Sequence, residues 1–453
     1  MDIFARAHLP RIAALALASA SFLAVTAAEA KEITIWCWDP NFNVAIMKEA
    51  GARYTKTHPD VTFNVVDFAK TDVEQKLQTG LASGTADALP DIVLIEDYGA
   101  QKYLQSFPGA FAALSGTVDY SGFAPYKVEV MTVDGQVYGM PFDSGVTGLY
   151  YRKDYLEQAG FKPEDMQNLT WDRFIEIGSQ VEAKTGKKMM GLDPNDGGLV
   201  RIIMQSAGQW YFDKEGKPNI TGNPALKAAV ETMSKIMSAN IYKPANGWSD
   251  WVGTFTSGDV ATVVTGVWIT GTVKAQPDQA GKWGVAPIPA LSIEGATHAS
   301  NLGGSSWYVL ESSAEKAEAI DFLNEIYGKD IDFYQKILQE RGAVGSLLAA
   351  RGGAAYEAAD PFFGGEKVWQ NFSDWLVKVP SVNYGVFTNE ADLAVTAQLP
   401  ALTQGMPVRR RAEGDRVRNQ RTYPVNRANA RQARPPAARG RGGCATASNP
   451  RFR

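Results

Sequence analysis

The sequence predicts an α/β fold arranged in two lobes. The chain has 453 residues, more than the size at which a single hydrophobic core usually stops growing, so two lobes are expected rather than one. Short apolar segments alternate with amphipathic segments about every 25 to 30 residues, a pattern typical of right-handed βαβ units around a parallel sheet. The hydrophobic content of 45% is ordinary for a globular protein.

Residues typical of helix ends predict where the first helices begin and end. Asp39 can cap a helix whose first position suits Pro40, and the helical spacing then continues to about His58. Thr71 and Glu74 form a capping-box pattern that opens the next helix. The periodic segments predict strands over 31–38, 61–67, 92–95 and 306–310, extended segments over 135–141 and 148–152, and helices over 39–58, 71–83, 171–185, 223–240, 313–327 and 331–341.

The first thirty residues are organised like a secretory signal peptide. Arg6 and Arg11 flank the start of an apolar run over residues 12–27, and an A-x-A cleavage pattern ends at Ala30. A transmembrane anchor is the alternative, but this run of about 16 residues is shorter than the ~20 that a helix needs to cross a bilayer. We therefore expect cleavage after Ala30 and a periplasmic protein that is not embedded in the membrane.

Residues 409–453 differ in composition from the rest of the chain. They hold thirteen arginines and no lysine, with Glu413 and Asp415 as the only acids. One explanation is a disordered basic arm, because segments rich in Arg, Pro, Gly and Ala bury too little apolar surface to fold. The second explanation, which we favour, is that a frame shift produced this tail. Resequencing the 3′ end of the gene tests this explanation, and an unchanged reading frame would contradict it. Secretion argues against nucleic acid as a partner.

Common catalytic and cofactor-binding motifs are absent from the sequence. There is no GxxxxGK[ST] loop, no GxGxxG after a strand, no HExxH and no GxSxG. Histidine is scarce, since His8 belongs to the expected signal peptide and only His58 and His298 remain. We therefore expect no cofactor, no metal site and no histidine-based catalytic triad.

The placement of tryptophan indicates a surface for a sugar. A Trp in a polar, Gly-rich stretch is more often part of a binding surface than one inside a periodic element. Its flat ring can cover the apolar C–H face of a sugar ring. Each such residue can instead belong to the core. The tryptophans in or beside such stretches are Trp38, Trp210, Trp248 and Trp268.

Polar residues follow several predicted strands, where ligands of open α/β sheets bind. Carboxylates and backbone groups suit the hydroxyl rim of a sugar. Simpler roles are a helix cap for Asp39, a solvated turn for Glu96 and Asp97, and a plain turn for the glycines. Lys70 and Arg341 are interpreted as surface or structural charges. The candidate ligand-binding residues of this group are Asp39, Glu96, Asp97, Asp143, Ser144, Gly303 and Gly304.

Several short stretches between residues 31 and 408 occur in the order found in one known family. These stretches are Glu32-Ile-Thr-Ile-Trp36, Leu89-Pro-Asp-Ile-Val93, Gly139-Met-Pro-Phe142, Gly148-Leu-Tyr-Tyr-Arg-Lys-Asp154, Leu169-Thr-Trp-Asp172, Gly266-Val-Trp268 and Trp283-Gly-Val-Ala-Pro-Ile-Pro289. In this ordered set the chain resembles the extracellular solute-binding proteins, which include maltose-binding protein and other sugar-binding proteins of ABC importers.

The resemblance implies the two-lobed type II periplasmic binding protein fold, with the ligand cleft between the lobes. It implies crossings near residues 142–145, 286–289 and 328–331, a sugar stacked on Trp268, and a cleft lined by Asp39 and Glu96. The N-terminal lobe is then expected to hold residues 31–143 and 288–330, and the C-terminal lobe residues 144–287 and 331–408.

The resemblance also implies a binding protein rather than an enzyme. Such a protein captures a small sugar as a monomer and hands it to the membrane permease subunits of an ABC importer. Residues 361–385 are similar to proteins of rhizobial importers for disaccharides, so lactose or another β-galactoside is the expected ligand. After residue 407 the sequence departs from the family pattern, which puts a closing helix of the second lobe in doubt.

A different class of function stays open on the residues alone. A secreted glycoside hydrolase needs only two carboxylates at a set separation. Glu96, Asp97 and Asp143 supply enough acids, and sequence spacing does not measure the distance between them.

Overall fold

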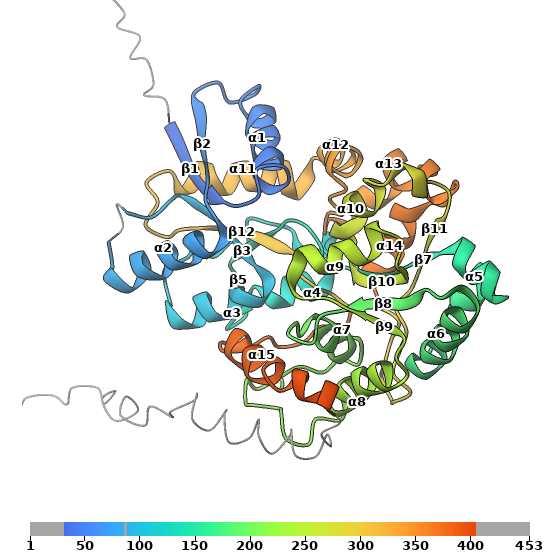
Figure 1. The fold of residues 1–453 in the computed structure, drawn as a ribbon. Coiled ribbons are helices and arrows are strands. Elements are labelled where there is room, and N and C mark those ends of the chain that lie inside the picture. The colour runs from blue at the N-terminus through green and yellow to red at the C-terminus, as the bar shows by residue number, and fades with distance from the viewer. Residues whose placement is uncertain (1–30, 86–87, 405–453) are drawn as a thin grey trace, which may run out of the picture.

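The computed structural model describes residues 31–85 and 88–404 (Figure 1). The expected signal segment over 1–30 and the Arg-rich tail over 409–453 lie outside the described residues. Two five-stranded sheets form the centres of two lobes, with helices packed around each of them. The predicted α/β fold class is confirmed.

The sheet of the first lobe has the strand order β2-β1-β3-β12-β6. Strands β2, β1 and β3 are parallel, whereas β12 runs antiparallel to both β3 and β6. Along β1, Ile33, Ile35 and Cys37 are buried and the alternate residues are partly exposed, as the period of two requires. The strands are β1 (Lys31–Cys37), β2 (Val61–Asp67), β3 (Ile92–Glu96), β6 (Gly139–Pro141) and β12 (Ser305–Val309).

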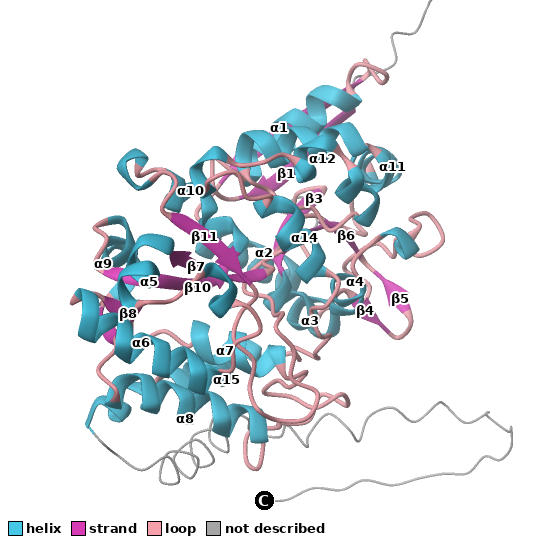
Figure 2. Cartoon of the chain, turned by 90° about the vertical axis from the view of Figure 1, so that its right-hand side faces the viewer, coloured by secondary structure: helices cyan, strands magenta, loops and turns pink. Residues whose placement is uncertain are grey.

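Five helices belong to this first sheet. Helix α11 packs beside α1, where the ring of Phe322 lies 5.4 Å from that of Tyr54 and 4.5 Å from that of Phe63. Figures 1 and 2 both show α1, α11 and α12 (Ile331–Arg341) together at one end of the molecule. The five helices are α1 (Asn43–Tyr54), α2 (Lys70–Ser83), α3 (Asp97–Ser106), α4 (Pro125–Val130) and α11 (Lys316–Lys329); β4 (Thr132–Val133) and β5 (Gln136–Val137) form a small hairpin after α4.

Two of the predicted helix caps are wrong. Asp39 has a φ of 65°, and its Oδ1 accepts from the backbone N–H groups of Asn41 and Phe42. This closes a separate turn, so α1 begins only at Asn43. Helix α2 begins one residue before Thr71, and no side chain caps it, so the expected capping box is absent.

The sheet of the second lobe has the order β11-β7-β10-β8-β9. Every residue of β7 and β10 is buried, because helices cover both faces of these strands. In both views α6 and α8 lie at the opposite end of the molecule from α1. The strands are β7 (Thr147–Arg152), β8 (Lys188–Leu192), β9 (Tyr242–Pro244), β10 (Val260–Gly266) and β11 (Trp283–Ala286).

The helices of the second lobe agree with the sequence prediction where caps are clear. Thr170 accepts from the N–H of Arg173 at the start of α6, and Asn223 accepts from two N–H groups at the start of α8. The helices are α5 (Lys153–Ala159), α6 (Trp171–Thr185), α7 (Gly198–Ser206), α8 (Pro224–Ser238), α9 (Gly247–Thr256), α10 (Thr270–Lys274), α13 (Ala354–Glu357), α14 (Val368–Leu376) and α15 (Thr388–Thr396).

Three chain segments pass side by side between the two sheets. Thr147 N–H donates to Ser300 O at 3.0 Å, and Leu302 N–H donates to Gly145 O at 2.8 Å. On the other side of the same segment, Ser144 N–H donates to Val344 O at 2.9 Å. We propose from these contacts that the first crossing lies at residues 142–145.

We propose that the other two crossings lie later in the chain than the resemblance implied. Ala290 N–H donates to Leu169 O at 2.8 Å, so the chain just after residues 286–289 remains with α6 in the second lobe. Helix α12 contacts the first lobe, because Lys336 forms an ion pair with Glu49 of α1 at 2.8 Å. We propose lobe boundaries near residues 300–304 and 342–346 instead.

A buried polar network holds the crossing in place. The side chains of Asp97 and Lys127 have no exposed surface and form an ion pair of 2.6 Å. Lys127 also donates to Ser305 O at 2.8 Å, while Ser305 N–H donates to Asp143 Oδ1 at 2.7 Å. Asp97 N–H donates to Gly304 O at 3.0 Å. These bonds connect the end of β3 with the start of β12.

Burial dominates the electrostatics of this network. It raises the pKa of Asp97 to about 6, although the positive charge of Lys127 acts in the opposite direction. Gly304 is required beside Asp97, since its φ is 85° and an added Cβ would lie 2.9 Å from Asp97 Oδ2. The network therefore depends on both its charges and its backbone conformation.

We predict that Lys127→Met lowers the free energy of unfolding by about 3 to 5 kcal/mol, because it leaves Asp97 buried without its cation. Urea denaturation followed by circular dichroism measures the change. The double variant Asp97→Asn with Lys127→Met removes both charges and should recover most of the loss. A single variant as stable as the parent chain would contradict the assigned role of the pair.

Candidate functional site

The first part of the site lies where β1 and β3 end. Trp38 is half-buried and Asp39 is exposed after β1, and Glu96 is partly exposed at the end of β3. Lys70, at the start of α2, forms an ion pair with Glu96, and its ammonium lies 5.9 Å from the centroid of the Trp38 ring. Parallel strands end at the same edge of a sheet, which is why β1 and β3 bring these residues together.

The second part of the site is an aromatic cluster on the other lobe. The ring of Trp248 lies 5.8 Å from that of Trp268 and 5.4 Å from that of Trp251. Trp248 is 57% exposed, which is unusual for so large an apolar side chain. Trp268 follows β10, and its Nε1 donates to Leu302 O at 2.8 Å, which fixes the plane of the indole.

A cavity of about 150 Å³ lies beside this cluster. The three tryptophans and Leu302 line one part of it, and Asp193 and Asp196 line another part. Asp193 Oδ2 accepts from the N–H of Gly247 at 2.6 Å, which ties the loop after β8 to the start of α9. The cavity thus combines flat apolar surfaces with carboxylates.

Gly303 lies between the two parts. A Cβ added to it would lie 3.4 Å from Trp268 Nε1 and 4.0 Å from Glu96 Oε1. Glu96 of the first lobe and Trp268 of the second lobe therefore face the same small volume beside Gly303. Its φ of 85° and this close approach both favour glycine.

Asp97, Asp143, Ser144 and Gly304 lie beneath this surface rather than on it. Asp97 and Asp143 are fixed by Lys127 and Ser305, and Ser144 Oγ lies 2.7 Å from the hydroxyl of Tyr126. Burial raises the pKa of Asp143 as well as that of Asp97. In this conformation these four residues are buried and support the crossing, and their contact with a ligand stays a prediction.

Trp210 is a core residue here. Its side chain is 1% exposed, its Nε1 donates to Thr388 Oγ1 at 2.9 Å, and its ring lies 4.8 Å from that of Tyr384 and 5.6 Å from that of Tyr98. A larger cavity of about 870 Å³ borders this region, but Trp210 is the only predicted site residue that lines it. The other predicted residues place the site at the smaller cavity.

Trp251, Asp193 and Asp196 were not among the predicted site residues, and Lys70 was interpreted as a surface or structural charge. Trp251 could have been found, because it follows Trp248 by three positions and so shares a face of α9. No local sequence pattern could have indicated a site role for Lys70, because its contact with Glu96 joins two separate segments of the chain.

Comparisons with known proteins indicate the family of this chain. A family model for "Bacterial extracellular solute-binding protein" matches residues 49–361. The lactose-binding protein of Rhizobium radiobacter is 73% identical over 400 residues, which cover 88% of this chain and 95% of that protein. The arabinooligosaccharide-binding protein of Bacillus subtilis is 26% identical over 304 residues, or 64% of this chain and 68% of that protein.

Solved structures share the fold. The sugar-binding protein MalE of Xanthomonas citri has a TM-score of 0.72 at 18% identity, covering 86% of this chain and 98% of that one. An ABC transporter associated binding protein from B. animalis subsp. lactis, solved with β-1,6-galactobiose, has a TM-score of 0.67 at 23% identity, covering 87% and 97%. The expected two-lobed periplasmic binding protein fold is confirmed.

These relatives are binding proteins, and the glycoside hydrolase alternative finds no support among them. The structure agrees, because two of the three candidate acids, Asp97 and Asp143, are buried and the third, Glu96, is paired with Lys70. From the family match and the 73% identity, the chain belongs to the bacterial extracellular solute-binding proteins.

Proposed function

We propose that this protein is the periplasmic sugar-binding component of an ABC importer, with lactose or another β-galactoside as its ligand. The choice of ligand rests on the 73% identity to a protein named for lactose binding. The structural neighbour that holds a β-linked galactobiose supports the same class of disaccharide.

The geometry of the site suits this ligand. Trp248, Trp251 and Trp268 offer flat surfaces for the apolar C–H face of a sugar ring. Glu96 offers a carboxylate for hydroxyl groups, and Lys70 beside it offers a donor. A sugar bound beside Gly303 would contact both lobes.

Contact with both lobes gives a mechanism for capture. The lobes rotate about the three crossing segments, and the sugar favours the closed arrangement because only that arrangement supplies both sets of contacts. A dissociation constant near ~1 μM corresponds to a binding free energy of about −8 kcal/mol, within reach of a stacked ring and a satisfied set of hydroxyl groups. The closed form then docks, as a monomer, on the permease subunits of the importer.

The proposed location follows from the family and the first thirty residues. Among the described residues, no helix is both long enough and apolar enough to span a membrane. We propose secretion to the periplasm with cleavage after Ala30.

Mass spectrometry of the protein purified from the periplasm checks the cleavage site. We expect a mature chain that begins at Lys31, because the A-x-A pattern ends at Ala30. A mass that retains the first thirty residues would contradict the proposal.

Titration with a panel of disaccharides, followed by tryptophan fluorescence, tests the ligand. We expect a saturable change with lactose, because the tryptophans of the cluster lie at the site, and we expect the sugar to be recovered intact by chromatography. Sucrose and maltose serve as matched controls of the same size. A response to neither lactose nor another β-galactoside would overturn the ligand, and hydrolysed sugar would overturn the binding function.

We predict that Trp248→Ala and Trp268→Ala each weaken sugar binding at least tenfold, a loss of about 1.4 kcal/mol or more, because each removes a stacking surface. Isothermal titration calorimetry measures the affinity. Trp248→Ala is the cleaner variant, since Trp268 also donates a hydrogen bond to Leu302.

Leu393→Ala is the control for these two variants. Leu393 is 69% exposed on α15, outside the aromatic cluster, so its loss should leave the affinity unchanged. Unchanged affinity in Trp248→Ala and Trp268→Ala would place the sugar elsewhere.

A further inference from the structure

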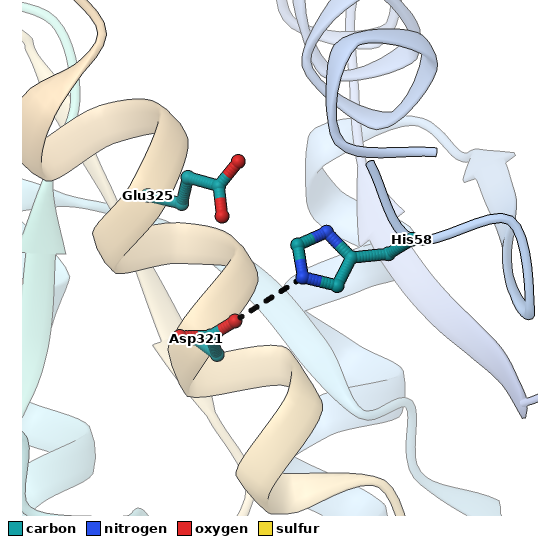
Figure 3. Close-up of side chains that lie close together, drawn as sticks. All are labelled: His58, Asp321 and Glu325. Atoms are coloured by element: carbon teal, nitrogen blue, oxygen red, sulfur yellow. Dashed lines mark ion pairs between the residues drawn. The ribbon is translucent and has the colours of Figure 1, made fainter. Parts of the chain in front are cut away.

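A cluster of one imidazole and two carboxylates lies on the first lobe, apart from the aromatic cluster and Glu96. His58 follows α1, whereas Asp321 and Glu325 lie four residues apart on α11 and so share one face of that helix. Figure 3 shows both carboxylates directed toward the imidazole ring. One donor atom from each residue lies within 4.8 Å of the other two.

We propose that His58, Asp321 and Glu325 bind a Zn²⁺ ion. Zinc accepts imidazole nitrogen and carboxylate oxygen at about 2.0 to 2.2 Å, and a site with three protein ligands keeps its fourth position for water. Mg²⁺ and Ca²⁺ prefer oxygen ligands alone, so the imidazole favours zinc over these ions. This inference does not depend on the proposed sugar.

The imidazole is held in an orientation suited to a metal. His58 Nδ1 lies 3.3 Å from Tyr54 O, and the His58 ring stacks on the Tyr54 ring with centroids 3.9 Å apart and planes 8° apart. Thr57 Oγ1 lies 3.0 Å from the same ring nitrogen. The other ring nitrogen, Nε2, is directed toward Asp321, whose Oδ2 lies 4.0 Å away. Metal-binding histidines characteristically hold one ring nitrogen against a polar group of the protein and offer the other to the metal.

The two carboxylates are oriented in a similar way. Tyr54 O–H donates to Asp321 Oδ2 at 2.8 Å, and Thr57 Oγ1 lies 3.4 Å from Glu325 Oε1. The Asp321 side chain is 60% exposed and that of His58 is 34% exposed. An ion can therefore reach the cluster from solvent, and small rotations of these side chains bring the donors to bonding distance.

The ion would connect two elements that are distant in sequence. His58 belongs to the turn between α1 and β2, and α11 is the helix that packs against α1. A zinc ion shared between them would stabilise the first lobe, because it binds the folded arrangement and not the separated segments. Without a metal ion, the alternative is a simple ion pair between His58 and Asp321.

The test uses the mature protein without a histidine tag, treated with a chelator and then dialysed. Calorimetric titration with ZnCl₂ should show one ion per chain, and the Tm should rise with zinc until the site saturates. His58→Gln, Asp321→Asn and Glu325→Gln should each weaken zinc binding at least ~tenfold, since each removes one of three ligands. Circular dichroism establishes that each variant is folded.

Two control variants match these changes. His298→Gln removes the other imidazole of the described residues, and Glu318→Gln removes a carboxylate from α11 outside the cluster. Both should bind zinc as the parent chain does. The proposal is overturned if the parent chain binds no zinc, if His58→Gln binds it with unchanged affinity, or if Ca²⁺ produces the same rise in Tm.

Discussion

The buried ion pair of Lys127 and Asp97 lies where β3 ends and where the chain returns from the second lobe into β12. Charges without exposed surface are costly unless they are paired, so this pair fixes the backbone around it. Ser305 is held through both its carbonyl and its N–H, and the turn at Gly303 and Gly304 leads from it toward the site. The relative position of Glu96 and Gly303 therefore depends on a buried network beneath the site.

The site on this support is divided between the lobes. The first lobe contributes charged and polar groups at the ends of β1 and β3, and the second contributes the tryptophan cluster of α9 and the segment after β10. Such a division suits a ligand with an apolar face and a hydroxyl rim. It also gives the proposed sugar a reason to favour one relative position of the lobes, since neither half alone offers both kinds of contact.

Glu96 and Asp97 illustrate how adjacent residues acquire different roles. Glu96 is the last residue of β3 and reaches the surface beside Lys70, whereas Asp97 is the first residue of α3 and enters the interior beside Lys127. The same pair of acids, considered from sequence alone, also fitted a hydrolase. Their different burial removes that option, because a carboxylate enclosed by Lys127 and the crossing segments cannot reach a substrate.

The sequence by itself determined the α/β class, most strands and the helices with clear caps, because hydrophobic period and capping are local properties. The bounds predicted for α6 and α12 agree with the structure for this reason. It also pointed to Trp248, Trp268 and Glu96. Only the tertiary structure decided that Trp210 is core, that Asp143 supports the crossing, and that His58 meets α11. Each of these outcomes depends on partners distant in the chain, and local composition carries no information about such partners.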